Sequence, residues 1–218
     1  MTSTHRELRE RALAANLEIP RRGLAIYTFG NVSAFDAQKG VLAIKPSGVP
    51  YERLSADDMV VVDLEGKVVE GRLRPSSDTP THVVLYSSFR GVAGIVHTHS
   101  TYATAWAARG EAIPCVLTMM GDEFGGTIPV GPFALIGDDS IGRGIVETLQ
   151  ASHSPAVLMQ NHGPFTIGKD ARSAVKAAVM CEEVARTVHI ARQLGEPLPI
   201  DPGQIESLYD RYQNVYGR

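Results

Sequence analysis

The sequence predicts a single α/β domain, and three observations support this prediction. At 218 residues the chain is long enough to bury one sizeable core. Its composition, 44% hydrophobic and 21% charged, is that of an ordinary globular protein. Segments with helical periodicity alternate with short apolar runs typical of buried strands, and the turn "DLEGK" predicts a hairpin, so we expect antiparallel strands.

Composition and charge narrow the class of function. The net charge of −3 is spread without a basic block, which favours a small-molecule partner over nucleic acid or a membrane surface. No apolar stretch approaches the roughly 18 residues of a membrane span, and the charged start "MTSTHRELRERALAANL" differs from a signal peptide, so we expect a cytoplasmic protein. Cys115 and Cys181 are far apart, which predicts two buried free thiols.

The N-terminal half is expected to contain strands between two helices. Apolar residues at helical spacing predict a first helix that stops at Pro20. The segment "LAIYTF" (24–29) is interpreted as a strand followed by a loop "GNVS", and "VLAIKPSG" and "MVVVDLEGKVVEG" add three more strands. A helix is predicted over residues 79–89, with a proline in its first turn, and a buried strand over 92–97.

The C-terminal half is expected to be mostly helical. "TYATAWAARG" predicts a short helix ended by Gly110, and "DSIGRGIVETLQ" another that Asp139 or Ser140 could cap. "PAVLMQ" indicates a second buried strand, which ends at "NHG". One apolar stripe predicts a long helix over 170–195, and one short helix is expected in the tail beyond Pro197.

Three histidines stand at the ends of predicted strands. His97 and His99 are one residue apart, so they leave the same face of a strand, and His162 follows the second buried strand. Three histidines with an open position are typical of a catalytic zinc site, whereas structural sites fill four positions and rely on cysteine. An isolated pair would favour a polar strand end, but the third histidine indicates a catalytic divalent metal site, with Zn²⁺ the expected ion. The remaining histidines are interpreted as structural or solvent-exposed: His5, His82, His153 and His189.

Three polar loops, "GNVS", "KPSG" and "PSSD", follow strand-like segments. Their backbone N–H groups and hydroxyls, with a nearby lysine, can hold a phosphate dianion, although each loop alone would be interpreted as a turn. Beside a three-histidine site they indicate a phosphorylated substrate. The candidate phosphate-binding residues are Gly30, Asn31, Lys45, Ser47, Gly48, Ser76 and Ser77.

The order "GNVS", "KPSG", "PSSDTPTH", "IVHTHS", "GTIPV" and "NHGPF" resembles the class II aldolase family of sugar-phosphate enzymes, from about residue 8 to the C-terminus. The resemblance implies an α/β/α sandwich around a mainly antiparallel sheet, with one domain over residues 1–218. It further implies a homotetramer whose active sites lie between subunits, with the tail (197–218) contributing to them. It adds Asp78 to the metal site.

Within this family the sequence resembles the L-ribulose-5-phosphate 4-epimerases. Asp78 stands where aldolases of the L-fuculose 1-phosphate type have a glutamate, and Asp122 and Tyr216 match the paired proton-transfer residues of the epimerases. The resemblance implies an epimerase that cleaves and re-forms the C3–C4 bond of a phosphorylated ketopentose, on an arabinose, ascorbate or other pentose route. A metal-dependent aldolase is one alternative. A non-catalytic binding domain, as in adducin heads, is another, but it would be expected to lack the metal histidines.

Overall fold

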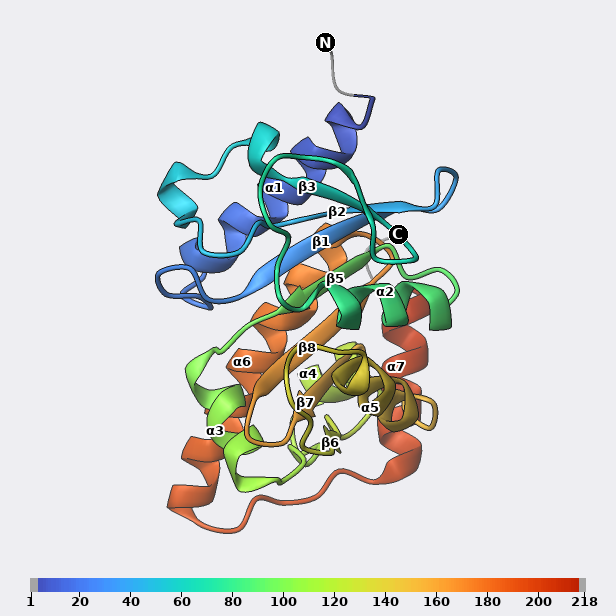
Figure 1. The fold of residues 1–218 in the computed structure, drawn as a ribbon. Helices are drawn as coiled ribbons and strands as arrows, with labels where there is room; N and C mark the ends of the chain where they lie inside the picture. The colour runs from blue at the N-terminus through green and yellow to red at the C-terminus, as the bar shows by residue number, and fades with distance from the viewer. Residues whose placement is uncertain (1–3, 216–218) are drawn as a thin grey trace.

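The computed structural model describes residues 4–215 and is built around one eight-stranded sheet with the order β4-β3-β2-β1-β5-β8-β7-β6 (Figure 1). Neighbouring strands are antiparallel, except that β6 and β7 are parallel. The strands are β1 (Asn31–Asp36), β2 (Val41–Ile44), β3 (Val60–Asp63), β4 (Val68–Glu70), β5 (Gly94–His97), β6 (Val130–Gly131), β7 (Ala156–Met159) and β8 (Gly163–Gly168).

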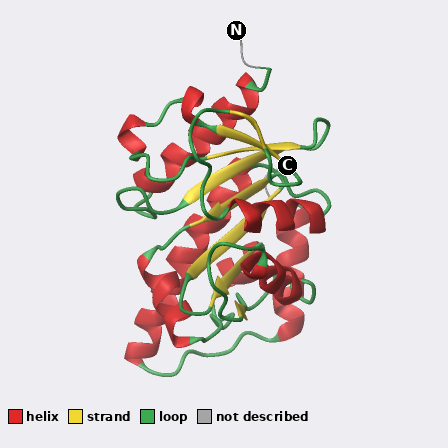
Figure 2. Ribbon diagram, viewed as in Figure 1, coloured by secondary structure: helices red, strands yellow, loops and turns green. Residues whose placement is uncertain are grey.

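Helices cover both faces of the sheet (Figure 2). One face packs against α2 and α5, and the other packs against α1, α3 and α6. The helices are α1 (Arg6–Arg21), α2 (Thr79–Ser88), α3 (Thr101–Arg109), α4 (Thr118–Phe124), α5 (Ser140–Leu149), α6 (Ala171–Leu194) and α7 (Pro202–Asn214), with short 3₁₀ turns η1 (Tyr51–Arg53) and η2 (Ala56–Asp58). The expected α/β/α sandwich with a mainly antiparallel sheet is therefore confirmed.

Strand β2 shows how the sequence builds the three layers. Val41 and Ala43 pack in the core that includes α1 and α6, whereas Leu42 and Ile44 pack in the core that includes α2 and α5. Successive side chains of a strand point to opposite faces, so a strand buried on both sides is apolar throughout. All four side chains are buried, as a central strand of a covered sheet requires.

Most predicted elements are confirmed. Helix α2 and the hairpin of β3 and β4 lie where the sequence predicts them. Helix α3 ends at Gly110, whose φ of 64° is left-handed and therefore suits glycine. Helix α1 continues one residue beyond Pro20, which lies in its last turn. Both cysteines are free and buried, as expected.

The segment 24–29 is a correction, because it is a turn and not a strand. Tyr27 has a left-handed φ of 53°, and Gly30 one of 80°, so the chain cannot stay extended there. Ile26 and Tyr27 are exposed, and the strand begins only at Asn31, inside the segment "GNVS" that was expected to be a loop. Helix α4 and strands β6 and β8 were not predicted.

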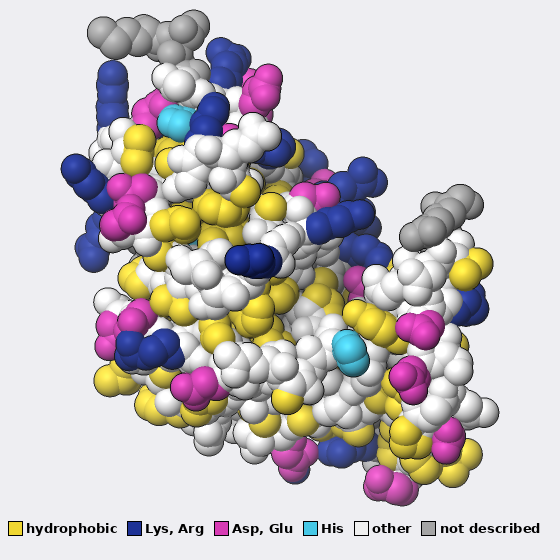
Figure 3. All heavy atoms as spheres, turned by 90° about the vertical axis from the view of Figure 1, so that its right-hand side faces the viewer, with side chains coloured by type: hydrophobic (Ala, Val, Ile, Leu, Met, Phe, Trp, Pro, Cys, Tyr) yellow, Lys and Arg dark blue, Asp and Glu magenta, His cyan; other side chains and the backbone are white. Residues whose placement is uncertain are grey.

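None of the helices within residues 4–215 is long and apolar enough to cross a membrane. On the side of the molecule seen in Figure 3, basic and acidic side chains are interspersed, with apolar side chains between them. The charge distribution on this face is therefore mixed, in line with the small net charge of the sequence.

Candidate active site

The histidine cluster (His97, His99 and His162) lies where the end of β5 meets the beginning of β8. His97 is the last residue of β5, and His162 lies in the turn between β7 and β8. Because β5 pairs with β8, these ends are adjacent, and one nitrogen from each of the three rings lies within 4.8 Å of the others. The structure thus brings together the three histidines that the sequence predicts.

Local backbone features bring His162 into the cluster. The preceding Asn161 adopts a left-handed φ of 59°, which asparagine tolerates better than most residues. The following Gly163 has no room for a side chain, since a Cβ atom there would lie 2.7 Å from the carbonyl oxygen of Thr98. The turn therefore depends on the "NHG" sequence itself.

Hydrogen bonds orient the rings for metal binding. Nδ1 of His97 lies 3.1 Å from the carbonyl oxygen of Pro164, so it donates there and leaves the lone pair on Nε2. Nε2 of His97 lies 3.0 Å from Nε2 of His99. Both ring nitrogens of His162 are buried without a hydrogen-bond partner among the described residues. Nitrogens bound to one Zn²⁺ at about 2.0–2.1 Å are about 3.4 Å apart, so the cluster fits such an ion.

The three rings are held in the neutral form that binds metals. Burial lowers the pKa of His97 to about 3, although the nearby carboxylate of Asp78 opposes this shift. Burial also lowers the pKa values of His99 and His162. At neutral pH the imidazoles therefore carry lone pairs that can coordinate a cation.

Asp78 lies next to the cluster rather than inside it. Its carboxylate Oδ2 accepts a hydrogen bond of 2.7 Å from Nδ2 of Asn31, which pairs with His97 across β1 and β5. Burial raises the pKa of Asp78, but His97, His82 and the bond from Asn31 together hold it below its ordinary value. The group of ligand atoms that lie within 4.8 Å of one another does not include this carboxylate. Asp78 therefore supplies negative charge beside the histidines.

The loops "KPSG" and "PSSD" form one cradle. The amide of Ser76 donates to the carbonyl oxygen of Lys45 at 3.1 Å, and the amide of Ser47 donates to Arg74 at 2.9 Å. Ser47, Gly48 and Ser77 are exposed, so they can be reached by a ligand. The cradle is linked to the histidine cluster through Asp78, whose Oδ2 lies 3.5 Å from the Ser76 hydroxyl and accepts from Asn31.

Lys45 is a buried cation at the base of this cradle. Its Nζ donates to the carbonyl oxygens of Thr28 at 3.2 Å and Pro46 at 3.4 Å, and it lies 4.8 Å from the ring centre of Tyr51. Within residues 4–215 it forms no ion pair. Burial lowers the pKa of Lys45 to about 8. An anionic ligand would supply the charge that this lysine lacks.

Of the two predicted proton-transfer residues, the structure describes Asp122, which it does not bond to the histidine cluster. Asp122 lies on α4, where its carboxylate accepts hydrogen bonds of 3.1 and 3.4 Å from Arg211 on α7. No hydrogen bond or ion pair between described residues joins Asp122 to a histidine of the cluster. Tyr216 lies outside the described residues.

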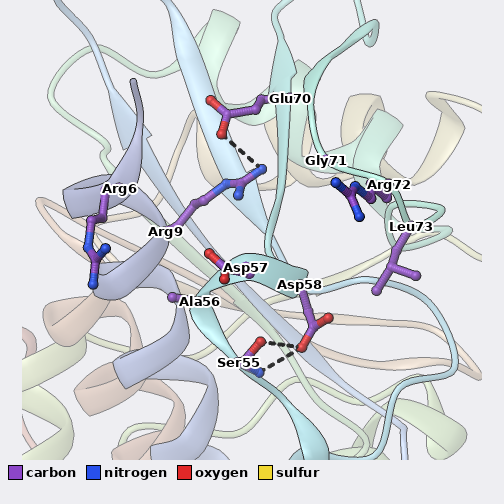
Figure 4. Close-up of a pocket in the computed structure, with 10 residues that line it drawn as sticks. All are labelled: Arg6, Arg9, Ser55, Ala56, Asp57, Asp58, Glu70, Gly71, Arg72 and Leu73. Atoms are coloured by element: carbon purple, nitrogen blue, oxygen red, sulfur yellow. Dashed lines mark hydrogen bonds and ion pairs between the residues drawn. The ribbon is translucent and has the colours of Figure 1, made fainter. Parts of the chain in front are cut away.

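A separate groove of about 860 Å³ lies between α1, η2 and the end of β4 (Figure 4). The guanidinium of Arg9 points at Glu70, with an N–O distance of 3.3 Å, and Ser55 bonds to Asp58. None of the predicted site residues lines this groove. Much of its charge is therefore paired within the protein, and the groove contains no part of the histidine cluster.

Sequence reasoning missed two residues that shape the cluster. The carbonyl oxygen of Pro164 orients His97, and the ring of Phe165 stacks on His97 with centroids 4.1 Å apart. Both belong to β8, which was not expected because "GP" at its start is typical of a turn. The apolar run "PFTI" was the signal for this strand.

Comparisons with known proteins agree with this fold. The sheet covered by helices on both faces, with three histidines at strand ends that could hold a metal ion, is the architecture of an α/β/α domain with a candidate metal site. Residues 10–189 match the model of the family described as Class II Aldolase and Adducin N-terminal domain, and the chain belongs to this family.

Two curated relatives are L-ribulose-5-phosphate 4-epimerases named UlaF, from Salmonella paratyphi B and Salmonella typhi. Each is 49% identical over 209 residues, which cover 89% of this chain and 90% of the relative. Among solved structures, an L-fuculose 1-phosphate aldolase is 27% identical with a TM-score of 0.90, over 98% of both chains. YgbL from Escherichia coli is 26% identical with a TM-score of 0.81, over 94% of this chain and 99% of that one.

Proposed function

We propose that the protein is a metal-dependent epimerase that interconverts L-ribulose 5-phosphate and D-xylulose 5-phosphate. One observation carries this proposal: a cluster of neutral histidines lies beside a cradle of polar loops that contains a buried lysine with no ion pair to any described residue. Such a site suits a sugar phosphate whose reacting oxygens and phosphate lie at opposite ends. The curated relatives named L-ribulose-5-phosphate 4-epimerase support this choice of substrate.

The chemistry explains why a cleavage mechanism is required. Removing the C4 hydrogen would leave a carbanion that the C2 carbonyl cannot stabilise. Breaking the C3–C4 bond instead gives glycolaldehyde phosphate and the enediolate of dihydroxyacetone, while the C4 hydroxyl proton passes to a base. The aldehyde rotates, adds through its other face, and its new C4 oxygen takes a proton. A bound divalent cation would supply Lewis-acid stabilisation of the developing negative charge.

The cation-binding residues in this proposal are His97, His99 and His162, with Asp78 as the associated carboxylate and Zn²⁺ as the ion. Pro164 fixes the tautomer of His97, and Asn31 holds Asp78 beside the cluster. Such supporting bonds are what a metal site uses to orient its ligands. Metal analysis of protein loaded with a mixture of divalent ions tests the choice of Zn²⁺.

The phosphate in this proposal is bound by the polar loops. Lys45 neutralises part of its charge, and the loop amides and hydroxyls hold the phosphate while the aldehyde fragment rotates. Held in this way, the fragment stays in the site until it adds again. The residues assigned to this role are Gly30, Asn31, Lys45, Ser47, Gly48, Ser76 and Ser77.

Two proton-transfer groups are needed because the C4 hydroxyl points to opposite sides in the two epimers. We assign these roles to Asp122 and Tyr216, and we propose a cytoplasmic homotetramer whose single-domain subunits complete one another's sites with the tail (197–218). Within residues 4–215 Asp122 is bonded to Arg211 of α7 and not to the histidine cluster of its own chain, which supports a site shared between subunits. So does the exposed loop of Ile26, Tyr27 and Phe29, because the ring of Phe29 lies 5.7 Å from that of His99.

Mixing two inactive variants tests the shared site. His97→Asn and Asp122→Asn subunits are each expected to be inactive alone. After dissociation and random reassembly at equal amounts, about a quarter of the shared sites would contain both intact halves, so activity should reappear. No recovery from tetramers that contain both variants would contradict the shared site.

An aldolase remains the second candidate, because the solved L-fuculose 1-phosphate aldolase covers 98% of this chain with a TM-score of 0.90. One assay separates the two. Metal-loaded protein is incubated with L-ribulose 5-phosphate, and the products are followed by NMR. D-xylulose 5-phosphate as the product supports the epimerase. Full-rate release of glycolaldehyde phosphate and dihydroxyacetone indicates the aldolase, and neither product indicates a binding domain or another substrate. The His97→Asn variant is the control.

A further inference from the structure

Helix α2 with its N-cap and strand β1 are joined by a row of side-chain contacts, here called the α2–β1 seam. On α2 the residues of the seam are four apart, and on β1 they are two apart, so each set lies on one face of its element. The pairs run in parallel order along both elements. The seam consists of Asp78 at the N-cap of α2, His82 and Tyr86 on α2, and Asn31, Ser33 and Phe35 on β1.

The contacts of the seam are short. Asn31 donates to Asp78 at 2.7 Å. The hydroxyl oxygen of Ser33 lies 2.7 Å from Nδ1 of His82 and 2.7 Å from the hydroxyl oxygen of Tyr86. Beyond them the rings of Phe35 and Tyr86 stack with centroids 4.6 Å apart. The seam therefore connects the carboxylate beside the histidine cluster to a fully packed part of the core.

His82 is the central residue of the seam, and one of its two ring nitrogens lacks a hydrogen-bond partner among the described residues. Its side chain is fully buried, and burial lowers its pKa to about 4, so the ring is neutral and carries one N–H. Nδ1 is bonded to Ser33, but Nε2 is buried without a hydrogen-bond partner in the part of the chain that the structure describes. A buried polar atom without a partner is costly and needs a reason.

The surrounding hydrogen bonds favour a proton on Nε2. The shorter contact of the Tyr86 hydroxyl, 2.7 Å, is with the hydroxyl oxygen of Ser33, against 3.2 Å to its carbonyl oxygen. When Tyr86 donates to the Ser33 hydroxyl, the Ser33 hydroxyl donates in turn to Nδ1 of His82. A neutral ring that accepts at Nδ1 carries its hydrogen on Nε2. The carboxylate of Asp78, one helical turn away, is the charge that acts on this ring, and it favours an N–H over a lone pair.

We infer that His82 is a positioning residue for Asp78: Ser33 fixes the ring at Nδ1, and the Nε2–H of His82 is directed at the Asp78 carboxylate. Asn31 then holds Asp78 from β1 while His82 steadies it from within α2. This role rests on the proposed function, because it matters for catalysis only if Asp78 belongs to the active site. It also gives a role to a histidine that the sequence alone indicated only as structural or solvent-exposed.

The tautomer of His82 can be measured without any activity. In protein labelled with ¹⁵N-histidine, two-dimensional ¹H–¹⁵N spectra show which ring nitrogen carries the proton. The signals of His82 are identified by their loss in His82→Gln. We expect the proton on Nε2 at neutral pH, and a shift of the Nε2 signal in Asp78→Asn that exceeds the shift of Nδ1. A proton on Nδ1, or signals that do not respond to Asp78→Asn, would overturn the inference.

Kinetics test the role of His82 with two variants, each of which replaces only one of the two ring nitrogens. An asparagine side chain reaches the position of Nδ1 but places no atom at Nε2, whereas glutamine can place an N–H near Nε2. We expect His82→Asn to lower kcat by about 10–100-fold, the usual range for residues that support a metal site. KM and metal content should stay within about twofold, and His82→Gln should recover part of kcat.

Three controls separate this role from packing. The exposed His189, replaced by asparagine, should leave kcat, KM and metal content unchanged. Thermal unfolding of each variant shows whether the fold is intact. If His82→Asn and His82→Gln lose kcat equally, or if kcat falls only in parallel with stability, His82 is a packing residue and the inference is wrong. If wild-type protein does not convert L-ribulose 5-phosphate, the proposed function fails, but the NMR result still decides the position of the proton.

Discussion

The region around the histidine cluster and the region of α4 and α7 are built in different ways. The cluster lies at the ends of central strands, and His97 and Asp78 are buried and bonded to neighbouring strands. Helix α7 has no buried residue among those described, and its polar contacts include an ion pair of Arg211 with Asp122 on α4 and a hydrogen bond of Tyr212 with Lys176 on α6. We call the region around the histidine cluster the rigid region, because its polar side chains are buried and bonded to strands. Its candidate metal and phosphate residues come from one chain. Asp122 on α4 is instead held by a surface ion pair that subunit assembly could change.

The largest effect is expected from the histidine cluster. His97→Asn and His162→Asn should each remove most of the bound metal and reduce activity to background, because two imidazoles cannot hold the ion as three do. Folding should survive, since the packed core contributes most of the stability. Metal content by mass spectrometry and thermal unfolding measure both effects, with His189→Asn as the control. Full metal retention in both variants would show that these histidines are not ligands.

A large loss is also expected in the α4 and α7 region, but with metal retained. Asp122→Asn should lower epimerisation by about 10²–10⁴-fold, the usual range for a general acid or base. Tyr216→Phe should do the same for the opposite face. Metal content should equal that of wild type, which would confirm that the two regions act separately. Asp210→Asn on α7 is the matched control, and wild-type rates for both Asp122→Asn and Tyr216→Phe would contradict the assigned roles.

A pH-dependent effect is expected at Lys45. Burial holds the pKa of its ammonium at about 8, so the charge that we assign to phosphate binding is present below pH 8 and is lost above it. We expect kcat/KM for the phosphorylated substrate to fall as the pH rises through about 8, and the fall to be absent in Lys45→Arg, whose guanidinium stays charged. An identical pH profile for wild type and Lys45→Arg would show that Lys45 does not titrate in the site.

Lys45 should have the opposite effect on stability. Its pKa in the folded protein lies below the value of about 10.4 expected in the unfolded chain, so the unfolded chain binds more protons between these values. Stability therefore rises with pH in this window, and the cost of burying the charge is fully present below pH 8. Lys45→Met should make the ligand-free protein more stable at pH 7 while weakening substrate binding. Urea unfolding of wild type at pH 7 and pH 9.5 tests the rise of stability with pH, and urea unfolding of Lys45→Met at pH 7 tests the gain in stability.

A smaller effect is expected in the phosphate cradle. Ser76→Ala and Asn31→Ala should each weaken substrate binding by about 1–3 kcal/mol, the usual cost of losing a hydrogen bond to a charged group. Asn31→Ala should also release Asp78, since it removes the bond of 2.7 Å between them, so its kcat should fall more than that of Ser76→Ala. Steady-state kinetics measure both. If neither KM nor kcat changes in either variant, the loops are only turns.

The sequence could predict the rigid region better than the second region. The histidines at the strand ends could be predicted from the sequence, because buried strands are apolar and the two-residue period of a strand places His97 and His99 on one face. The pairing of β1 with β5, which brings Asn31 and Asp78 to the histidines, depends on tertiary contacts that no local pattern contains. Strand β8 was missed because glycine and proline begin it, although only glycine fits beside Thr98 at position 163.

The position of Asp122 could not be predicted for a different reason. Helix α4 is seven residues long and contains a glycine at position 121, so its helical pattern is weak. That glycine lets α4 pack closely on α7, because a Cβ atom there would lie 2.9 Å from Cδ1 of Leu208 and 3.1 Å from its Cβ. The contact joins segments almost ninety residues apart, as does the pair of Asp122 and Arg211. The sequence shows that residue 122 is an aspartate, but the neighbours of Asp122 depend on how α7 packs against α4.

The smallest effect is expected from the surface contacts that hold α7. Lys176 on α6 donates to Glu123 at 2.6 Å and also to the Tyr212 hydroxyl, so it links three helices. Its side chain is 51% exposed, and such pairs contribute about 0–1 kcal/mol because water screens them.

Lys176→Met should therefore lower the free energy of unfolding by no more than about 1 kcal/mol, measured in urea against the exposed Lys169→Met. The local effect should be larger than the global one, because α7 has few buried contacts of its own. Amide hydrogen exchange in α7 should become faster in Lys176→Met, while exchange in β5 and β8 and the metal content stay unchanged. Faster exchange in β5, or loss of metal, would show that the two regions are coupled, and the contrast between a rigid metal region and an adjustable α4 and α7 region would be wrong.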